Sequence, residues 1–217
     1  MSKPILYSYF RSSCSYRVRI ALYLKEIDFE YRAVHLLKEG GEQKKETYLK
    51  HNPKGEVPFF IHEDFAVAQS MAILHYMDSV WQMPSLFPKD VKKYSICLEL
   101  CELINAGIQP LQNLKVLQYL QKELGVDEKN KDKWNAFWVS EGLFALEKRL
   151  QLFQGRFSLG DDVSAVDLFL VPQVYNARRF NVDIDQFPRI KSIEEYCLTL
   201  EAFQKALPEN QPDAPVV

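Results

Sequence analysis

Short apolar stretches of two different periods alternate along the first part of the chain. Residues 4–9 form a short, mostly apolar and aromatic run, which is typical of a buried strand. From residue 14 to residue 25 the apolar positions recur at helical spacing instead, which predicts a helix. The same signals continue, and together they predict strand, helix, strand, loop, one helical turn, two strands and a helix, over residues 4–9, 14–25, 29–34, 38–42, 48–51, 57–61, 65–67 and 69–77.

The helix predicted over residues 14–25 has one face with almost no charge. That face carries Val18, Ala21, Leu22 and Lys25, of which only the lysine tip is polar. Arg17 and Arg19 fall on other faces, and an arginine taken alone is more often a solvated surface charge than a binding residue. We therefore expect one buried face on this helix, with the two arginines away from it.

Beyond these elements the strand signals disappear. Residues 81–93 contain two prolines and are the best candidate for a linker. Residues 94–124 form a long helical pattern in which a bend is expected near Gly107 and Pro110. A second long helix is expected over residues 134–153, where aromatic and apolar residues recur at helical spacing.

Two further helix starts are predicted by capping boxes, in which a serine is followed three residues later by an acid. Ser164 with Asp167 is one, and Ser192 with Glu195 is the other. Residues 208–217 are rich in proline, so we expect this tail to lie extended on the surface.

The order of elements predicts an α+β domain followed by an all-α domain. We place the first domain at residues 1–81 and the second at residues 90–217. The strand and helix order of the first domain fits a thioredoxin-like module, and the second domain fits a helical bundle.

Composition narrows the function classes without naming one. The 217 residues carry 29 acids against 27 bases, and this balance argues against a nucleic-acid-binding protein. We find no apolar run long enough to span a membrane and no apolar core of a secretory signal, so no membrane partner is expected. The four cysteines form no CxxC pair, which favours free thiols in the cytoplasm and argues against a bound metal.

The stretch that carries candidate chemistry lies where the first strand passes into the first helix. Ser12, Ser13 and Cys14 cluster there, and the first N–H groups of a helix have no partner within the helix. These groups and the helix dipole stabilise an anion, so the position suits a thiolate, either that of Cys14 or one from a ligand. Helix capping by Ser12 or Ser13, with Cys14 as packing, explains the same residues equally well.

Two dipeptides add weaker signals. A cis bond between Val57 and Pro58 would turn the Val57 backbone outward to pair with a peptide-like ligand, although an ordinary proline at a strand edge is the alternative. Gln69 and Ser70 open a helix whose first N–H group is available to a carboxylate. Capping of that helix by Ser70 is the more economical explanation.

The run from Ser12 to Leu22, SSCSYRVRIAL, resembles the signature of the zeta-class glutathione transferases, the family of the maleylacetoacetate isomerases. The resemblance extends over essentially the whole chain. It includes Asn52-Pro53, Val57-Pro58, Gln69-Ser70 and residues 107–114, 170–177 and 211–215. It implies a glutathione-binding thioredoxin-like domain, an all-helical substrate domain and a homodimer.

The resemblance also implies roles for particular residues. The catalytic positions would be Ser12, which donates a hydrogen bond to the glutathione thiolate, with Ser13 and a supporting Cys14. The positions implied to bind glutathione are Ser12, Ser13, Cys14, Ser15, Tyr16, Arg17, Gln43, Val57, Gln69, Ser70, Gln109 and Asn113. Arg179 matches a basic position that the family associates with the acidic substrate, although the neighbouring Arg178 could take its place. Because arginine binds carboxylates well, we expect Arg11 to bind the acid together with Arg179, with Arg17 as a further candidate. Tyr16 stands where many members have tryptophan.

The activity implied by the family is the glutathione-dependent cis–trans isomerisation of maleylacetoacetate to fumarylacetoacetate, in the breakdown of tyrosine and phenylalanine. Maleylpyruvate isomerase would use the same chemistry on a shorter acid. A thiol oxidoreductase would use Cys14 to form a mixed disulfide, and Ser12 counts against that alternative. A carrier without catalysis would have no need of the serine–cysteine run.

Overall fold

The computed structural model describes residues 3–215, and their contacts divide the chain into two compact units. Unit 1 lies within Met1–Leu86 and Leu198–Val217, and unit 2 is Phe87–Cys197. The boundary falls inside the expected linker. The C-terminal segment differs from the expected 90–217 domain, because its described residues pack with the first unit.

Unit 1 is built on a mixed sheet of four short strands in the order β2-β1-β3-β4. Strand β1 pairs in parallel with β2 and antiparallel with β3, which in turn pairs antiparallel with β4. The strands are β1 (Ile5–Ser8), β2 (Glu30–Ala33), β3 (Phe59–His62) and β4 (Phe65–Ala68). The predicted order of strands and helices is confirmed, and with it the thioredoxin-like α+β class.

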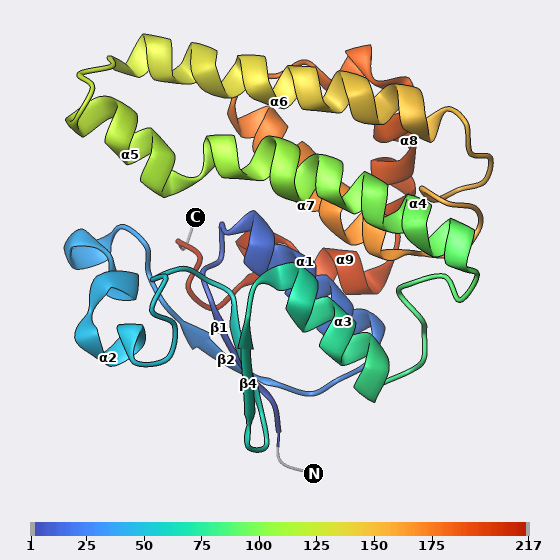
Figure 1. Cartoon of the computed structure of the whole chain (residues 1–217), viewed down its shortest axis with the longest axis horizontal. Helices are drawn as coiled ribbons and strands as arrows, with labels where there is room; N and C mark the ends of the chain where they lie inside the picture. The colour runs from blue at the N-terminus through green and yellow to red at the C-terminus, as the bar shows by residue number, and fades with distance from the viewer. Residues whose placement is uncertain (1–2, 216–217) are drawn as a thin grey trace. The chain divides into compact units, whose positions relative to one another are not determined.

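The helices of unit 1 include one from the far end of the chain. They are α1 (Ser13–Leu24), α2 (Glu46–Leu49), α3 (Ser70–Val80) and α9 (Glu201–Ala206), with short 3-10 turns η1 (Lys38–Gly40), η2 (Glu42–Lys44) and η6 (Pro208–Asn210). Helix α1 packs against both α3 and α9, and Figure 1 shows α9 lying beside it. This contact is the main reason why the C-terminal segment belongs to unit 1.

Helix α1 is buried on more than one face, because residues 15–22 are all buried, and this corrects the expectation of a single buried face. The Arg17 and Arg19 side chains are both fully buried. The Arg19 guanidinium donates to Ser8 Oγ, at the end of β1, and to the carbonyl oxygens of Phe10 and Ala206. A buried guanidinium is tolerated because such acceptors replace the water that it loses. The α9 contact supplies one of those acceptors, which no local pattern could reveal.

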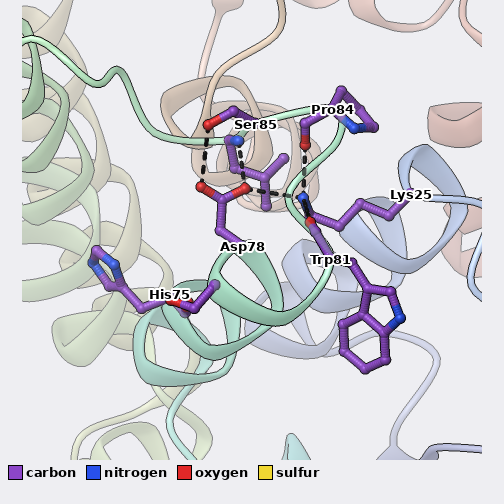
Figure 2. Close-up of polar contacts among 8 residues, drawn as sticks. Lys25, His75, Asp78, Trp81, Pro84 and Ser85 are labelled. Carbon is purple, nitrogen blue, oxygen red and sulfur yellow. Dashed lines mark hydrogen bonds and ion pairs between the residues drawn. The ribbon is translucent and has the colours of Figure 1, made fainter. Parts of the chain in front are cut away.

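A third buried cation, Lys25, lies at the end of α1 and joins this helix to the segment that follows α3. Its ammonium group lies 2.9 Å from Asp78 Oδ1 and donates to the carbonyl oxygens of Trp81 and Pro84, each at 2.6 Å (Figure 2). The same carboxylate accepts the Leu86 N–H at 2.7 Å. The lysine tip therefore fixes the path of the chain as it leaves α3, and the first part of the expected linker is an ordered part of unit 1.

Unit 2 is all helical. Its elements are α4 (Val91–Glu102), η3 (Leu103–Ile108), η4 (Gln109–Gln112), α5 (Leu114–Lys122), α6 (Glu128–Leu150), α7 (Ala165–Arg179), η5 (Ile184–Gln186) and α8 (Pro188–Cys197). Helix α7 packs against α4 and α8 in the middle of this unit. Among residues 3–215, no helix is long and apolar enough to cross a membrane.

The long helix expected over residues 94–124 is interrupted rather than bent. After α4 the chain forms a π-helical turn and then a 3-10 turn, and α5 begins as a separate helix. Pro110 lacks the N–H that a continuing helix needs. The Trp134 indole donates to the Leu111 carbonyl at 2.8 Å, and Gln112 and Gln173 form a buried amide pair at 2.7 Å. The irregular segment is thus held by named partners on α6 and α7.

One of the two predicted capping boxes is confirmed. The Ser164 side chain and the Asp167 carboxylate cap the start of α7 reciprocally. The box predicted at Ser192 is wrong, because α8 begins earlier, at Pro188. The Glu147 carboxylate on α6 accepts the first N–H groups of α8, from Arg189 and Ile190, so the cap comes from another helix.

The C-terminal tail is also more ordered than expected. Within the described part of residues 208–217, Pro208 starts a 3-10 turn, and Gln211 is buried and donates to the carbonyl oxygens of Lys205 and Leu207. The expectation of an extended surface tail is therefore wrong for this segment. Residues 216–217 lie outside the described part of the chain.

The buried Lys25–Asp78 pair predicts a large loss of stability when the lysine is removed. Lys25→Met leaves the Asp78 carboxylate largely buried without its cation, so the free energy of unfolding should fall by about 3 kcal/mol. Denaturant unfolding measures this. The matched control is Lys50→Met, which breaks the exposed pair between Lys50 and Glu46 and should cost less than about 1 kcal/mol. Equal effects of the two substitutions would contradict the assignment.

Candidate active site

The candidate site is centred on Ser12, which lies immediately before α1. Its backbone is extended, and its Oγ accepts the Ser15 N–H at 3.2 Å, so Ser12 is the N-cap of the helix. A hydroxyl that accepts one hydrogen bond still has a proton to donate. Capping and thiolate stabilisation, which the sequence leaves as alternatives, are therefore compatible in one side chain.

The run after Ser12 is mostly buried. Ser13, Ser15 and Tyr16 are buried, whereas Cys14 and Ser12 are partly exposed. A ligand at this helix start can therefore reach the Ser12 hydroxyl, the Cys14 thiol and the backbone N–H groups of the first turn. The binding roles expected of Ser13, Ser15 and Tyr16 stay predictions.

A second helix start is joined to the first by Arg17. The buried Arg17 guanidinium donates to Ser70 Oγ at 3.1 Å, and Ser70 is the first residue of α3. Gln69 occupies the N-cap position with a positive φ of 72°, and no side chain caps the helix. Capping by Ser70, the more economical expectation, is wrong. The free N–H groups of α3 and the cation behind Ser70 instead favour an anion at this place.

Two further predicted residues of unit 1 have polar atoms available for a ligand. Gln43 is buried and donates to the Leu36 carbonyl at 3.2 Å, but its Oε1 has no partner among the described residues. The Val57–Pro58 bond is cis, as the sequence suggested. Within residues 3–215, no hydrogen bond of the Val57 backbone is found. A peptide-like ligand with a thiol and a carboxylate fits this set of free donors and acceptors.

The predicted residues of unit 2 lie on the interrupted segment and at the end of α7. Gln109 is partly exposed at the start of η4, and Asn113 caps α5 by accepting the Lys115 N–H at 3.0 Å. Both are thus placed by the break in the helix that follows α4. Their roles toward a ligand stay predictions.

The structure separates the two neighbouring arginines of α7. Arg178 forms an ion pair with the buried Glu194 carboxylate of α8. The Arg179 guanidinium donates to Asn176 Oδ1 at 3.1 Å and lies over the Phe180 ring. Arg178 is therefore committed to a structural pair, and the role expected of Arg179 toward the acidic substrate stays a prediction.

Asp213 and Tyr31 lie close to the site, and the sequence pattern predicts neither of them as a site residue. The Asp213 carboxylate accepts the Phe10 N–H at 3.0 Å and the Tyr31 hydroxyl at 2.6 Å. Both bonds join segments that lie far apart in the chain, so no local period signals them. The sequence shows only that an acidic residue, Asp213, stands in a proline-rich tail.

Within the described residues, no group of three or more His, Cys, Asp or Glu side chains could hold a metal ion.

The mixed sheet and the two helix starts joined through Arg17 and Ser70 define a thioredoxin-like protein that can bind a thiol-bearing anion. Residues 2–79 match the family model "Glutathione S-transferase, N-terminal domain". The chain is 45% identical to the maleylacetoacetate isomerase of Dictyostelium discoideum, over 98% of this chain and 97% of that protein. It therefore belongs to the glutathione transferase family, and specifically to the zeta class with the maleylacetoacetate isomerases.

Solved structures agree with this assignment. A maleylpyruvate isomerase described as a bacterial zeta-class glutathione transferase has a TM-score of 0.94 and 38% identity, covering 97% of this chain and 100% of its own. A maleylacetoacetate isomerase from Anaeromyxobacter dehalogenans with bound glutathione has a TM-score of 0.88 and 40% identity, covering 98% of each chain. The resemblance predicted from the sequence is thus confirmed.

The burial of the thiols predicts a selective reaction at Cys14. Cys97, Cys101 and Cys197 are buried, and burial raises the pKa of the Cys197 thiol, whereas Cys14 is partly exposed. A thiol-alkylating reagent should therefore modify Cys14 first in the folded protein, and peptide mass spectrometry after brief exposure measures the order. The denatured protein, in which all thiols react, is the control. Equally fast alkylation of any other cysteine would contradict this prediction.

Proposed function

We propose that this protein is a glutathione-dependent cis–trans isomerase that converts maleylacetoacetate to fumarylacetoacetate, with glutathione transferase activity. The observation that carries the proposal is the Ser12 hydroxyl at the start of α1, which caps the helix and still has a proton to donate. The maleylacetoacetate isomerases that resemble the chain over almost its full length support the choice of reaction.

Bound glutathione would supply a thiolate that adds beside a carbonyl group, so that the cis double bond becomes single, rotates and reforms when the thiol leaves. Ser12 would stabilise that thiolate by donating its hydroxyl proton, and the free N–H groups of α1 would add to the effect. In unit 1, the N–H groups of α3 with Ser70 would hold a carboxylate. The Val57 backbone and Gln43 would pair with the peptide groups of the tripeptide.

The remaining predicted residues are assigned supporting roles. Cys14 would support the thiolate from beside Ser12, and Ser13, Ser15 and Tyr16 would shape the helix start from within the core. Gln69 would contribute its backbone, which has a positive φ. Gln109 and Asn113 would offer polar groups of unit 2 to glutathione. Unit 1 would be the glutathione-binding domain, and the helical unit would bind the second substrate.

The second substrate is an acid, and arginine suits it because a guanidinium binds a carboxylate through two parallel hydrogen bonds. Arg11 is partly exposed next to the candidate site, and its guanidinium lies over the Phe10 ring. On α7, the family resemblance implies Arg179, and Arg178 forms an ion pair with Glu194. We propose Arg11 and Arg179 as the residues that bind the acid.

A second candidate, maleylpyruvate isomerase, is favoured by one specific observation. The zeta-class maleylpyruvate isomerase has nearly the same fold as this chain. The chemistry is shared, and only the length of the acid differs, so the two candidates are separated by substrate preference alone.

Assembly and location are the remaining parts of the proposal. We propose a homodimer, as the family resemblance implies. We propose a cytoplasmic location, which the four free cysteines support, because free thiols are typical of reducing compartments.

The test is a glutathione-dependent assay with maleylacetoacetate and maleylpyruvate compared side by side. We expect turnover of maleylacetoacetate at the higher kcat/KM and no turnover without glutathione. Ser12→Ala should lower kcat by about ten-fold to a hundred-fold, because it removes a hydrogen bond to a charged atom. Cys14→Ala is the matched control and should lower kcat by a smaller factor than Ser12→Ala does. Full activity of Ser12→Ala would overturn the role of Ser12, and a preference for maleylpyruvate would favour the second candidate.

The arginine assignment predicts a change in KM for one substrate only. Arg179→Gln should raise the KM for the acid by about ten-fold and leave the KM for glutathione unchanged, because it removes one charge-assisted contact to the acid. Steady-state kinetics with each substrate varied in turn measures both constants. Arg178→Gln, which breaks the pair with Glu194, is the control and should lower the melting temperature without a selective change in KM. The reverse pattern would assign the substrate to Arg178.

A further inference from the structure

The loop before Ser12 is held by a carboxylate from the far end of the chain. Asp213 Oδ2 accepts the Phe10 N–H at 3.0 Å, and its Oδ1 accepts the Tyr31 hydroxyl, on β2, at 2.6 Å. Phe10 lies two residues before Ser12. A residue of the C-terminal segment therefore touches the backbone that leads directly to the candidate catalytic serine.

Further hydrogen bonds hold the backbone of this loop. The Ser12 N–H donates to the Tyr9 carbonyl at 3.0 Å, which closes a turn over Tyr9–Ser12. The buried Arg19 guanidinium donates to the carbonyl oxygens of Tyr9 and Phe10 at 3.3 and 2.9 Å. Phe10 is therefore held by a cation on its C=O and by an anion on its N–H, which are the stronger kind of hydrogen bond.

The segment that carries Asp213 is built to stay in place. The Ala214 N–H donates to the Gln211 carbonyl at 3.0 Å, which closes a turn around Asp213. The Gln211 side chain is buried and donates to the carbonyl oxygens of Lys205 and Leu207, each at 2.8 Å. Burial and the bond to Asp213 raise the pKa of Tyr31, so its hydroxyl remains a donor throughout the working range of pH.

The bond from Tyr31 to Asp213 and the bonds of Gln211 already fasten the tail to unit 1. The bond to Phe10 adds a constraint at a place where small displacements change the direction of the Ser12 hydroxyl. Misplacing a group that acts on reacting atoms by about 1 Å can lower a rate by about a hundred-fold. The geometry therefore connects the tail with the orientation of Ser12 rather than with stability alone.

We propose that Asp213 is a positioning residue, which holds the turn before α1 so that the Ser12 hydroxyl points toward the thiol of bound glutathione. The proposal rests on the role proposed above for Ser12. It assigns a function in the reaction to the C-terminal segment, through a backbone contact rather than through contact with a substrate.

The test measures the pKa of the bound thiol as well as activity. In Asp213→Ala, the ultraviolet absorbance of the thiolate in the complex with glutathione alone should titrate at higher pH, because the hydrogen bond from Ser12 to the thiolate is weakened. The kcat should fall by about ten-fold, with its rising limb moved to higher pH. Loss of the negative charge by itself would lower the thiol pKa, so a rise identifies the loss of positioning.

Two matched variants separate positioning from fastening. Asp213→Asn removes the charge but keeps an oxygen that can accept the Phe10 N–H, so it should recover most of the kcat and should not raise the thiol pKa. Tyr31→Phe removes the other bond to the same carboxylate. It should lower the melting temperature but leave the thiol pKa unchanged.

A folded Asp213→Ala variant with an unchanged or lowered thiol pKa would overturn the proposal, and so would a Tyr31→Phe variant that raises that pKa equally. If Asp213→Ala does not fold, the thiol pKa is measured in Asp213→Glu instead. This variant keeps the carboxylate but displaces it, because the glutamate side chain is longer. A raised thiol pKa in Asp213→Glu supports the proposal, and the wild-type value contradicts it. Ser12→Ala, titrated in parallel, must itself raise the thiol pKa. Otherwise the proposed role of Ser12 fails, independently of Asp213.

Discussion

The Arg19 guanidinium is shielded from solvent, so its donors must find acceptors inside the protein. They find them at the end of β1, in the turn before α1 and at the Ala206 carbonyl of α9. Burial lowers the pKa of Arg19, and each lost acceptor would leave a cation that is costly to keep in the core. The chain therefore cannot bury α1 without bringing residues close to its C-terminus against the turn that precedes Ser12. This requirement explains why the C-terminal segment belongs to unit 1 and why Asp213 lies close to Phe10.

Much of the fold could be predicted from the sequence because its signals are local. The apolar strand over residues 4–9 and the helix over residues 14–25 differ in period, and each period appears within a few residues. The Ser164 and Asp167 capping box is equally local, since both residues belong to one turn. The same holds for Ser12, whose position before α1 follows from where the strand pattern stops and the helical pattern starts.

Features whose partners are distant in sequence could not be predicted in this way. An arginine taken alone is more often solvated than buried, and no local pattern predicts that Arg17 is buried with Ser70 of another helix as its acceptor. The start of α8 was misplaced because its cap is the Glu147 carboxylate of α6, which leaves no serine or threonine signal nearby. The tail was expected to be extended because prolines disfavour regular structure, whereas its order comes from Gln211 and Asp213. In each case the deciding interaction is a hydrogen bond to a buried polar group, and such bonds leave no periodic trace in a single sequence.

The two roles proposed for Ser12, helix cap and hydrogen-bond donor to a thiolate, would together limit which residues can replace it. Asp and Asn cap helices as well as Ser does, so stability alone would accept either of them at this position. An aspartate, however, would set a negative charge against a thiolate, and the asparagine side chain is longer and presents an amide in place of a hydroxyl. Selection for a more stable helix and selection for faster catalysis would therefore favour different side chains at position 12. An engineer who sought a more heat-resistant form would do better to strengthen α1 from its other end, where Lys25 ends the helix, and leave the first cap untouched.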